Sequence, residues 1–265
     1  MAAVGIIGAS GFTGAELLRL CAAHPDLDVV VATGDSQAGT AVADLYPSLA
    51  AHYGDLTFAE VDDTTADGCD VVFLGLPHGA SQALVPDLAS RVGHVIDLAA
   101  DFRLRDAALY PEWYDEPHTA PGLLVDFAYG LPELYRPSIV GAPLIAVPGC
   151  YPTATSLALA PFVWGGHVEP SGLVVDAASG VSGAGRPPKP HTTFCAVDED
   201  YCAYGLVGHR HTPEMEQAVG TRADGSVVDH VSILKVAVSE IELKIIPHHV
   251  KKTHVRWFIE AELTL

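Results

Sequence analysis

The sequence has few positive charges: 14 of its 265 residues are lysine or arginine and 33 are acidic, for a formal net charge of −19. Such a chain repels phosphate groups, so we expect neither nucleic acid nor an anionic membrane as a partner. Long apolar runs are also absent, and none reaches the roughly 20 residues of a membrane-spanning helix. The N-terminal segment lacks the charged region, apolar stretch and cleavage site of a secretory leader. We therefore expect a cytoplasmic protein.

Cysteine is scarce, with five residues in no regular spacing. They are Cys21, Cys69, Cys150, Cys195 and Cys202. An odd, irregular set argues against a disulfide framework and is typical of a reduced cytoplasmic protein. Cys195 and Cys202 lie near His191, but this spacing matches no compact zinc motif, so we expect no metal site. Cys21 and Cys69 fall within apolar helix and strand patterns and are predicted core residues.

Apolar residues are abundant, at 49% of the chain, and they lie in short runs that alternate with helical patterns. The predicted strands are residues 3–8, 27–33, 69–77, 93–100 and 142–149. Helices are predicted over residues 15–24 and 79–91, with Pro86 bending or splitting the second. Continuous apolar strands that alternate with helices predict an α/β fold with a Rossmann-type, doubly wound parallel sheet. Residues 101–143 read as a long irregular, functional loop.

The second half predicts a smaller domain. A helix is expected over residues 153–164 and a strand over 172–179, followed by a glycine-rich loop. We expect a dinucleotide-binding domain at residues 1–149 and an α+β substrate domain with a reduced mixed sheet at residues 150–265. The runs at 231–238 and 241–246 have strand character and are expected to pair with 172–179. An unpaired apolar edge there favours self-association, so we expect a homo-oligomer, either a dimer or a tetramer.

A glycine loop follows the first predicted strand. Gly8, Gly11 and Gly14 have the spacing G-x-x-G-x-x-G, which lets the backbone approach a pyrophosphate at a helix N-terminus. The spacing differs from G-x-G-x-x-G, and the alternative is an ordinary strand-to-helix turn. After the second strand, Asp35 could accept a ribose 2′-hydroxyl, or Thr33 and Ser36 could bind a 2′-phosphate. These residues leave the choice between NAD and NADP open.

Cys150 lies between a predicted strand and a predicted helix, flanked by Pro148 and Pro152. A helix N-terminus stabilises a thiolate and offers N–H donors to the oxyanion of a tetrahedral intermediate. The alternative is a packed structural cysteine, the common fate of this residue type. We predict that Cys150 is a nucleophile.

His209 and His211 precede a predicted helix that starts at Pro213, with Thr212 as its expected N-cap. A rigid loop before a helix suits a histidine that is positioned as an acid/base group. The alternative interpretation is a pair of solvated histidines. Arg103 and Arg186 are scarce cations in loops after strands. Each could hold a carboxylate or phosphate, or form a surface ion pair.

Seven segments together resemble one family. In chain order they are GASGFTGAELLRL, LGLPHG, DLAADFRL, YGLPEL, VPGCYPTA, SGVSGAGR and HRHTPEMEQ. From Ala3 to about Gln217 the sequence resembles the N-acetyl-gamma-glutamyl-phosphate reductases of arginine biosynthesis, relatives of aspartate-semialdehyde dehydrogenase. From about Val227 the tail does not match, and the chain is shorter than is usual in this family.

The resemblance implies that Cys150 attacks N-acetyl-L-glutamyl 5-phosphate, expels phosphate and forms a thioester, which NADPH reduces to N-acetyl-L-glutamate 5-semialdehyde. It implies His211 as the acid/base group. The implied substrate contacts are Arg103, Arg186, His209 and Glu214. The implied NADP(H) contacts are Gly8, Ser10, Gly11, Phe12, Thr13, Gly14, Thr33, Ser36, Pro77, Ser182 and Gly183.

Two other functions compete with this one. The unmatched tail favours a catalytically impaired homologue that still binds dinucleotide. A cysteine hydrolase would also use a nucleophile like Cys150, but it has no need of the glycine loop.

Overall fold

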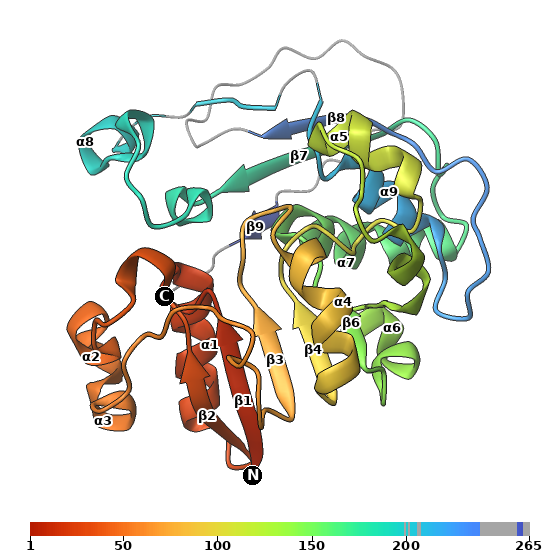
Figure 1. The fold of residues 1–265 in the computed structure, drawn as a ribbon. Helices are drawn as coiled ribbons and strands as arrows, with labels where there is room; N and C mark the ends of the chain where they lie inside the picture. Colours follow the sequence, from red (N-terminus) through yellow and green to blue (C-terminus); the bar gives the residue numbers. More distant parts are fainter. Residues whose placement is uncertain (199, 201, 206–207, 239–258, 262–265) are drawn as a thin grey trace. The chain divides into compact units, whose positions relative to one another are not determined.

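The structure is a computed structural model that describes residues 1–198, 200, 202–205, 208–238 and 259–261. It divides into two compact units. The first comprises Met1–Pro111 and Asp115–Pro148, and the second comprises Glu112–Tyr114 and the chain from Gly149 onward. Figure 1 shows the elements of both units.

The first unit is built on a six-stranded sheet with the order β2-β1-β3-β4-β6-β5. Its strands are β1 (Ala2–Ile7), β2 (Leu27–Ala32), β3 (Val71–Leu74), β4 (His94–Asp97), β5 (Ala128–Tyr129) and β6 (Leu144–Ala146). Every pairing is parallel. The chain first builds outward from β1 to β2 and then returns to the other side of β1 through β3. This reversal beside β1 confirms the predicted doubly wound sheet.

The helices of this unit are α1 (Phe12–Ala23), α2 (Val42–Leu45), α3 (Ala50–Tyr53), α4 (Ser81–Arg91) and α6 (Pro132–Ile139), while α5 (Tyr110–Tyr114) spans the division between the units. Helix α1 places Leu18 and Cys21 on one face, where they pack against Val4 and Ile6 of β1 in a buried cluster. Burial of one such aliphatic side chain contributes roughly 1.5–3 kcal/mol. Cys21 and Cys69 are buried, as predicted. Helix α4 runs through Pro86 as one helix, so the proline does not split it; the alternative, a bend at Pro86, stays a prediction.

Residues 101–143 are more ordered than the sequence predicted. They contain α5, α6, a 3₁₀ helix at Pro121–Asp126 and the short strand β5, which pairs with β6. Strand β5 has only two residues, too few for a period-two pattern to be recognised.

The second unit contains α7 (Cys150–Trp164), β7 (Leu173–Ser179), α8 (Phe194–Val197), α9 (Thr212–Gly220), β8 (Ile233–Val238) and β9 (Ile259–Ala261). Its described strands form a sheet with the order β8-β7-β9. Strand β8 pairs with β7 as predicted, whereas β9 was not predicted and the run at 241–246 lies outside the described residues.

The pairings of β7 with β8 and with β9 are both parallel, so the expected mixed sheet is wrong for the strands described. The chain passes through α9 between β7 and β8, which gives the long crossover connection that a parallel pairing needs. Helices α7 and α9 contribute Leu159, Met215 and Val219 to a core shared with β7. This shared core fixes the start of α9 relative to the start of α7. Among the residues described, no helix has the length and apolarity needed to cross a membrane.

Candidate active site

Cys150 is the first residue of α7 and its side chain is exposed. The preceding Gly149 is the N-cap, with the extended backbone angles φ −66° and ψ 162°. Thr153 donates to the Gly149 carbonyl twice, from its backbone N–H and from its hydroxyl, each at 2.9 Å. The predicted strand-to-helix setting of Cys150 is therefore present, and the residue stands at the helix end toward which the free N–H groups are directed.

Glu214 is fully buried in the first turn of α9. Its Oε1 accepts a hydrogen bond from the Gly149 backbone N–H at 3.0 Å. This contact joins the histidine helix to the residue before the nucleophile. The described contact positions the turn that carries Cys150, and the expected contact of this side chain with substrate stays a prediction.

His209 and His211 lie together at the start of α9, with ring centroids 4.9 Å apart. The His211 backbone N–H donates to His209 Nδ1 at 3.2 Å, so that nitrogen acts as an acceptor. Burial, and secondarily the charge of Arg210, lower the pKa of His209, which agrees with a neutral ring. The N-cap of α9 is His211 rather than the predicted Thr212.

Tyr151 brings these histidines and the nucleophile's helix together. Its ring contacts His209 edge-on at a centroid distance of 5.1 Å and lies 5.9 Å from the ring of His211. Its hydroxyl is 2.6 Å from that of Tyr204. Burial, assisted by Tyr204, raises the pKa of Tyr151, so the phenol stays protonated. Sequence reasoning did not single out either tyrosine, although Tyr151 directly follows Cys150.

The glycine loop of the first unit needs its glycines. Gly8 has φ +87°, and a Cβ there would lie 2.4 Å from the Gly75 carbonyl oxygen. A Cβ on Gly14 would lie 2.4 Å from backbone atoms of Ala9, while Gly11 is the N-cap of α1. Only glycine permits this approach of the loop to neighbouring backbone. The geometry fits a loop that brings a pyrophosphate close to the start of α1.

Two side chains support this loop. Thr33 is fully buried, and its Oγ1 accepts the Gly8 N–H at 3.1 Å. The Tyr46 hydroxyl donates to the Ser10 carbonyl at 2.7 Å and is 3.1 Å from that of Gly11. The described contact of Thr33 therefore holds the loop, and its expected contact with a 2′-phosphate stays a prediction. Tyr46 was not predicted, because nothing in its local sequence links it to residues 35 positions away.

The other predicted ligands remain predictions. Asp35, Ser36, Thr13 and Pro77 are exposed, and Phe12 opens α1. Ser182 and Gly183 lie in a 3₁₀ helix, Val181–Ala184, and Arg186 in the loop after it is partly exposed. Arg103 is buried and donates to the carbonyls of Val147 and Leu98, each at 2.7 Å. Its described contacts therefore support the backbone before Cys150. Within the described part of the chain, no group of three or more histidine, cysteine and acidic residues is arranged to hold a metal ion.

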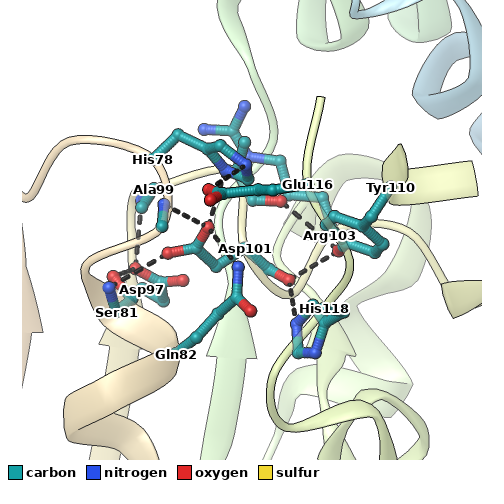
Figure 2. A network of polar contacts seen from close by, with 12 residues as sticks. His78, Ser81, Gln82, Asp97, Ala99, Asp101, Arg103, Tyr110, Glu116 and His118 are labelled. Carbon is teal, nitrogen blue, oxygen red and sulfur yellow. Dashed lines mark hydrogen bonds and ion pairs between the residues drawn. The ribbon is translucent and has the colours of Figure 1, made fainter. Parts of the chain in front are cut away.

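A buried polar network that the sequence did not predict surrounds Asp101, just after β4 (Figure 2). Its Oδ1 accepts from the Gly79 N–H at 2.7 Å and lies 2.6 Å from His78 Nδ1. Gln82 Nε2 also donates to Oδ1 at 3.2 Å, and the Ser81 N–H donates to Oδ2 at 3.0 Å. The carboxylate thus accepts three hydrogen bonds and has a close contact with His78 Nδ1, from the segment before α4 and from the first two residues of that helix.

Two buried carboxyl groups in this network differ in acidity. Burial alone would raise the pKa of Asp101, but its hydrogen bonds, led by that from His78, outweigh burial and lower it. Asp97 ends β4 and accepts from Ser81 Oγ and the Ala99 N–H at 2.8 and 3.0 Å. Burial raises the pKa of Asp97 to about 6. Two carboxyl groups four residues apart therefore have opposite pKa shifts.

Two family models match the chain. One, described as "Semialdehyde dehydrogenase, NAD binding domain", matches residues 3–142, and the other, "Semialdehyde dehydrogenase, dimerisation domain", matches residues 150–251. The first contains the glycine loop and the Asp101 network, and the second contains Cys150 and the histidines.

Curated relatives are similar over most of the chain. An N-acetyl-gamma-glutamyl-phosphate reductase from Pseudomonas entomophila is 51% identical over 227 residues, which is 86% of this chain and 66% of the relative. That from Pseudomonas putida strain W619 is 50% identical over 88% of this chain and 69% of the relative. The chain thus spans about two thirds of the length of the curated relatives it matches.

Solved structures support the fold. Aspartate semialdehyde dehydrogenase from Candida albicans, solved with NADP, aligns with a TM-score of 0.61 at 14% identity over 91% of this chain and 68% of that one. Aspartate semialdehyde dehydrogenase II from Vibrio cholerae aligns with a TM-score of 0.63 at 15% identity over 91% and 70% of the two chains.

Proposed function

We propose that this chain, which belongs to the semialdehyde dehydrogenase family and there to the N-acetyl-gamma-glutamyl-phosphate reductases, reduces N-acetyl-L-glutamyl 5-phosphate to N-acetyl-L-glutamate 5-semialdehyde and phosphate. The observation that carries the proposal is Cys150 at the N-terminus of α7, joined through Gly149 to the helix that His211 caps. The reaction is a step of arginine biosynthesis.

The first step is acyl transfer to Cys150. The thiolate Sγ attacks the acyl carbon, a C–S bond forms, and the bond from that carbon to the phosphate oxygen breaks with release of phosphate. Negative charge develops on the acyl oxygen during the attack. The backbone N–H groups of the first turn of α7 are directed toward this charge and stabilise it. The result is a thioester on Cys150.

His211 supplies the acid and base chemistry. It takes the proton from the Cys150 thiol, and it returns a proton to the Cys150 sulfur when the C–S bond breaks and the aldehyde is released. His209 fixes the backbone of His211 by accepting its N–H, and the ring of Tyr151 lies against both imidazoles. Arg186 is the proposed partner of the substrate's anionic groups, since guanidinium pairs well with carboxylate and phosphate.

The glycine loop is the proposed cofactor site. Gly8 and Gly14 let the loop lie against the backbone of Gly75 and Ala9, and the N-terminus of α1, capped by Gly11, suits a pyrophosphate. NADP(H), when bound, supplies the hydride that reduces the thioester. Ser10, Phe12, Thr13, Ser36 and Pro77 are the proposed further contacts from this unit, and Ser182 and Gly183 those from the second.

We further propose that the protein works as a homo-oligomer in the cytoplasm. The family model that matches residues 150–251 is named for dimerisation, which supports self-association.

The test is the reverse reaction. The chain is mixed with N-acetylglutamate 5-semialdehyde and NADP⁺, with and without inorganic phosphate, and NADPH is followed by its absorbance. We expect formation of NADPH that requires phosphate and is lost in Cys150→Ser. The matched control Cys195→Ser changes an exposed cysteine in α8 and should keep the activity. Binding of NADP⁺ without turnover would instead identify an impaired homologue, and activity without phosphate would contradict an acyl-phosphate product.

A further inference from the structure

Residues 42–53 form a segment that packs against α1. The segment contains α2, the 3₁₀ helix Pro47–Leu49 and α3, and it lies in the connection between β2 and β3. Val42 and Leu49 from this segment are buried in the same apolar cluster as Leu18 of α1. A polar side chain that the segment carries therefore has a fixed position relative to α1.

Two tyrosine hydroxyls of this segment bind backbone carbonyl groups at α1. The Tyr53 hydroxyl donates to the carbonyl of Leu18, inside the helix, at 3.0 Å. The Tyr46 hydroxyl donates to the Ser10 carbonyl at 2.7 Å and lies 3.1 Å from the Gly11 carbonyl oxygen, immediately before the helix. The two tyrosines thus make the same kind of contact at different places, and Tyr46 is the one at the glycine loop.

The two halves of the glycine loop are held through different backbone groups. In the first half, the Gly8 N–H donates to Thr33 Oγ1 at 3.1 Å. The second half, Ser10 and Gly11, is held by carbonyl groups that accept from Tyr46. The Gly11 N–H is 3.5 Å from the Gly8 carbonyl, which is longer than a typical hydrogen bond. Tyr46 therefore holds the second half without using the N–H groups there.

The contacts of Tyr46 decide where the next N–H groups point. In a planar trans peptide the carbonyl and the following N–H point in opposite directions, and the described peptide bonds are trans. Because the Ser10 carbonyl points toward Tyr46, the Gly11 N–H points away from it. The Gly11 carbonyl also accepts the Ala15 N–H at 2.9 Å, so the Phe12 N–H is directed out of the helix end. The first N–H groups of a helix have no partner within it and form the positive end of its dipole.

We propose that Tyr46 is a positioning residue for the pyrophosphate of the dinucleotide. It acts through the carbonyls of Ser10 and Gly11, which it fixes so that the N–H groups that follow them face the pyrophosphate before the cofactor binds. Groups already held in the binding geometry lose less conformational freedom on binding, which raises affinity. The inference rests on the proposed function, because it assumes that the glycine loop binds NADP(H).

A ligand with the pyrophosphate and a ligand without it provide the test. Binding of NADP⁺ and of adenosine 2′-phosphate, which has no pyrophosphate, is measured by calorimetry on the full chain and on Tyr46→Phe. The variant keeps the ring and loses a neutral hydrogen bond, which corresponds to about fivefold in affinity. We therefore expect Tyr46→Phe to weaken NADP⁺ binding by about fivefold and to leave adenosine 2′-phosphate binding within about twofold.

Tyr53→Phe is the matched control, because it removes the same kind of hydroxyl contact from α1 at a place away from the loop. It should keep both affinities within about twofold of wild type. Equal weakening of NADP⁺ binding by the two variants would mean a general role in anchoring residues 42–53. That result, unchanged NADP⁺ binding in Tyr46→Phe, or an equal loss for adenosine 2′-phosphate would overturn the inference. A wild-type chain that does not bind NADP⁺ would overturn the proposed function itself.

Discussion

Gly149 and Glu214 are 65 positions apart in the chain, yet the backbone N–H of one donates to the buried carboxylate of the other at 3.0 Å. The bond joins the turn before the nucleophile to the first turn of the histidine helix. It makes the position of Cys150 depend on α9 as well as on α7.

Glu214→Ala should therefore reduce both stability and turnover. The change leaves a buried N–H without its acceptor, which costs roughly 1–3 kcal/mol. We expect a lower melting temperature and a kcat reduced by about tenfold or more, since small displacements of a nucleophile are costly. Glu214→Gln keeps an acceptor oxygen and should lie closer to wild type. Glu169→Ala, at an exposed site in the same unit, is the control. If Glu214→Ala had the same kcat as wild type, Glu214 would not be needed to position Cys150.

Gly8→Ala should destabilise the first unit more than Gly39→Ala does. Both glycines have positive φ, +87° and +84°, so both substitutions carry the left-handed cost of about 1 kcal/mol. Only Gly8 adds a collision, because its Cβ would lie 2.4 Å from the Gly75 carbonyl, whereas nothing lies within 4 Å at Gly39. Chemical denaturation compares the two variants. Equal losses of unfolding free energy would contradict the close approach of the loop to Gly75.

Asp97→Asn should increase stability at neutral pH. Burial raises the pKa of Asp97 to about 6 in the folded protein, above its unfolded value of about 3.9. The folded state then binds the Asp97 proton more tightly than the unfolded state does. Protonation of Asp97 therefore stabilises the fold fully below pH ~3.9, and this stabilisation is lost as the pH rises through about 6. The amide stays neutral and keeps an acceptor for Ser81 and Ala99.

The difference in unfolding free energy between Asp97→Asn and wild type should therefore grow between about pH 4 and 7, by up to about 3 kcal/mol. Asp55→Asn, at an exposed position in the same unit, should show no such trend. A difference that does not change with pH would mean that Asp97 is not the titrating group.

His211→Asn should lower kcat more than His209→Asn. Loss of an acid/base group costs about 10²–10⁴-fold in rate. His209 accepts the His211 backbone N–H, and an asparagine oxygen can take over that role, so its replacement should be milder. Single-turnover rates of both variants decide the order. If His209→Asn were the slower enzyme, the acid/base role would pass to His209.

The parts of the site that the sequence predicted are those set by local backbone requirements. Gly8 needs a positive φ next to a strand end, and Cys150 follows a proline–glycine turn at the start of a helix. Both requirements are visible within a few residues of sequence. For the same reason the apolar runs predicted the main strands of the first sheet.

The parts that were missed depend on contacts between distant segments. Asp101 and His78 are 23 positions apart in two loops, and neither has a local pattern that indicates the other. Tyr46 lies 36 positions from Ser10. The predicted mixed sheet was wrong for the described strands because strand direction depends on how the chain crosses over between β7 and β8. Contacts of this kind form only when the chain folds, because burial and backbone geometry then bring together segments that are far apart in the sequence.

The most direct test of the central claim, that Cys150 carries the acyl group, is the intact mass of the protein mixed with N-acetylglutamyl 5-phosphate in the absence of NADPH. We expect a gain of one N-acetylglutamyl group in place of the thiol hydrogen, mapped by peptide analysis to Cys150 and removed when NADPH is added. No adduct, or an adduct on the exposed Cys195 or Cys202 that persists in Cys150→Ala, would contradict it.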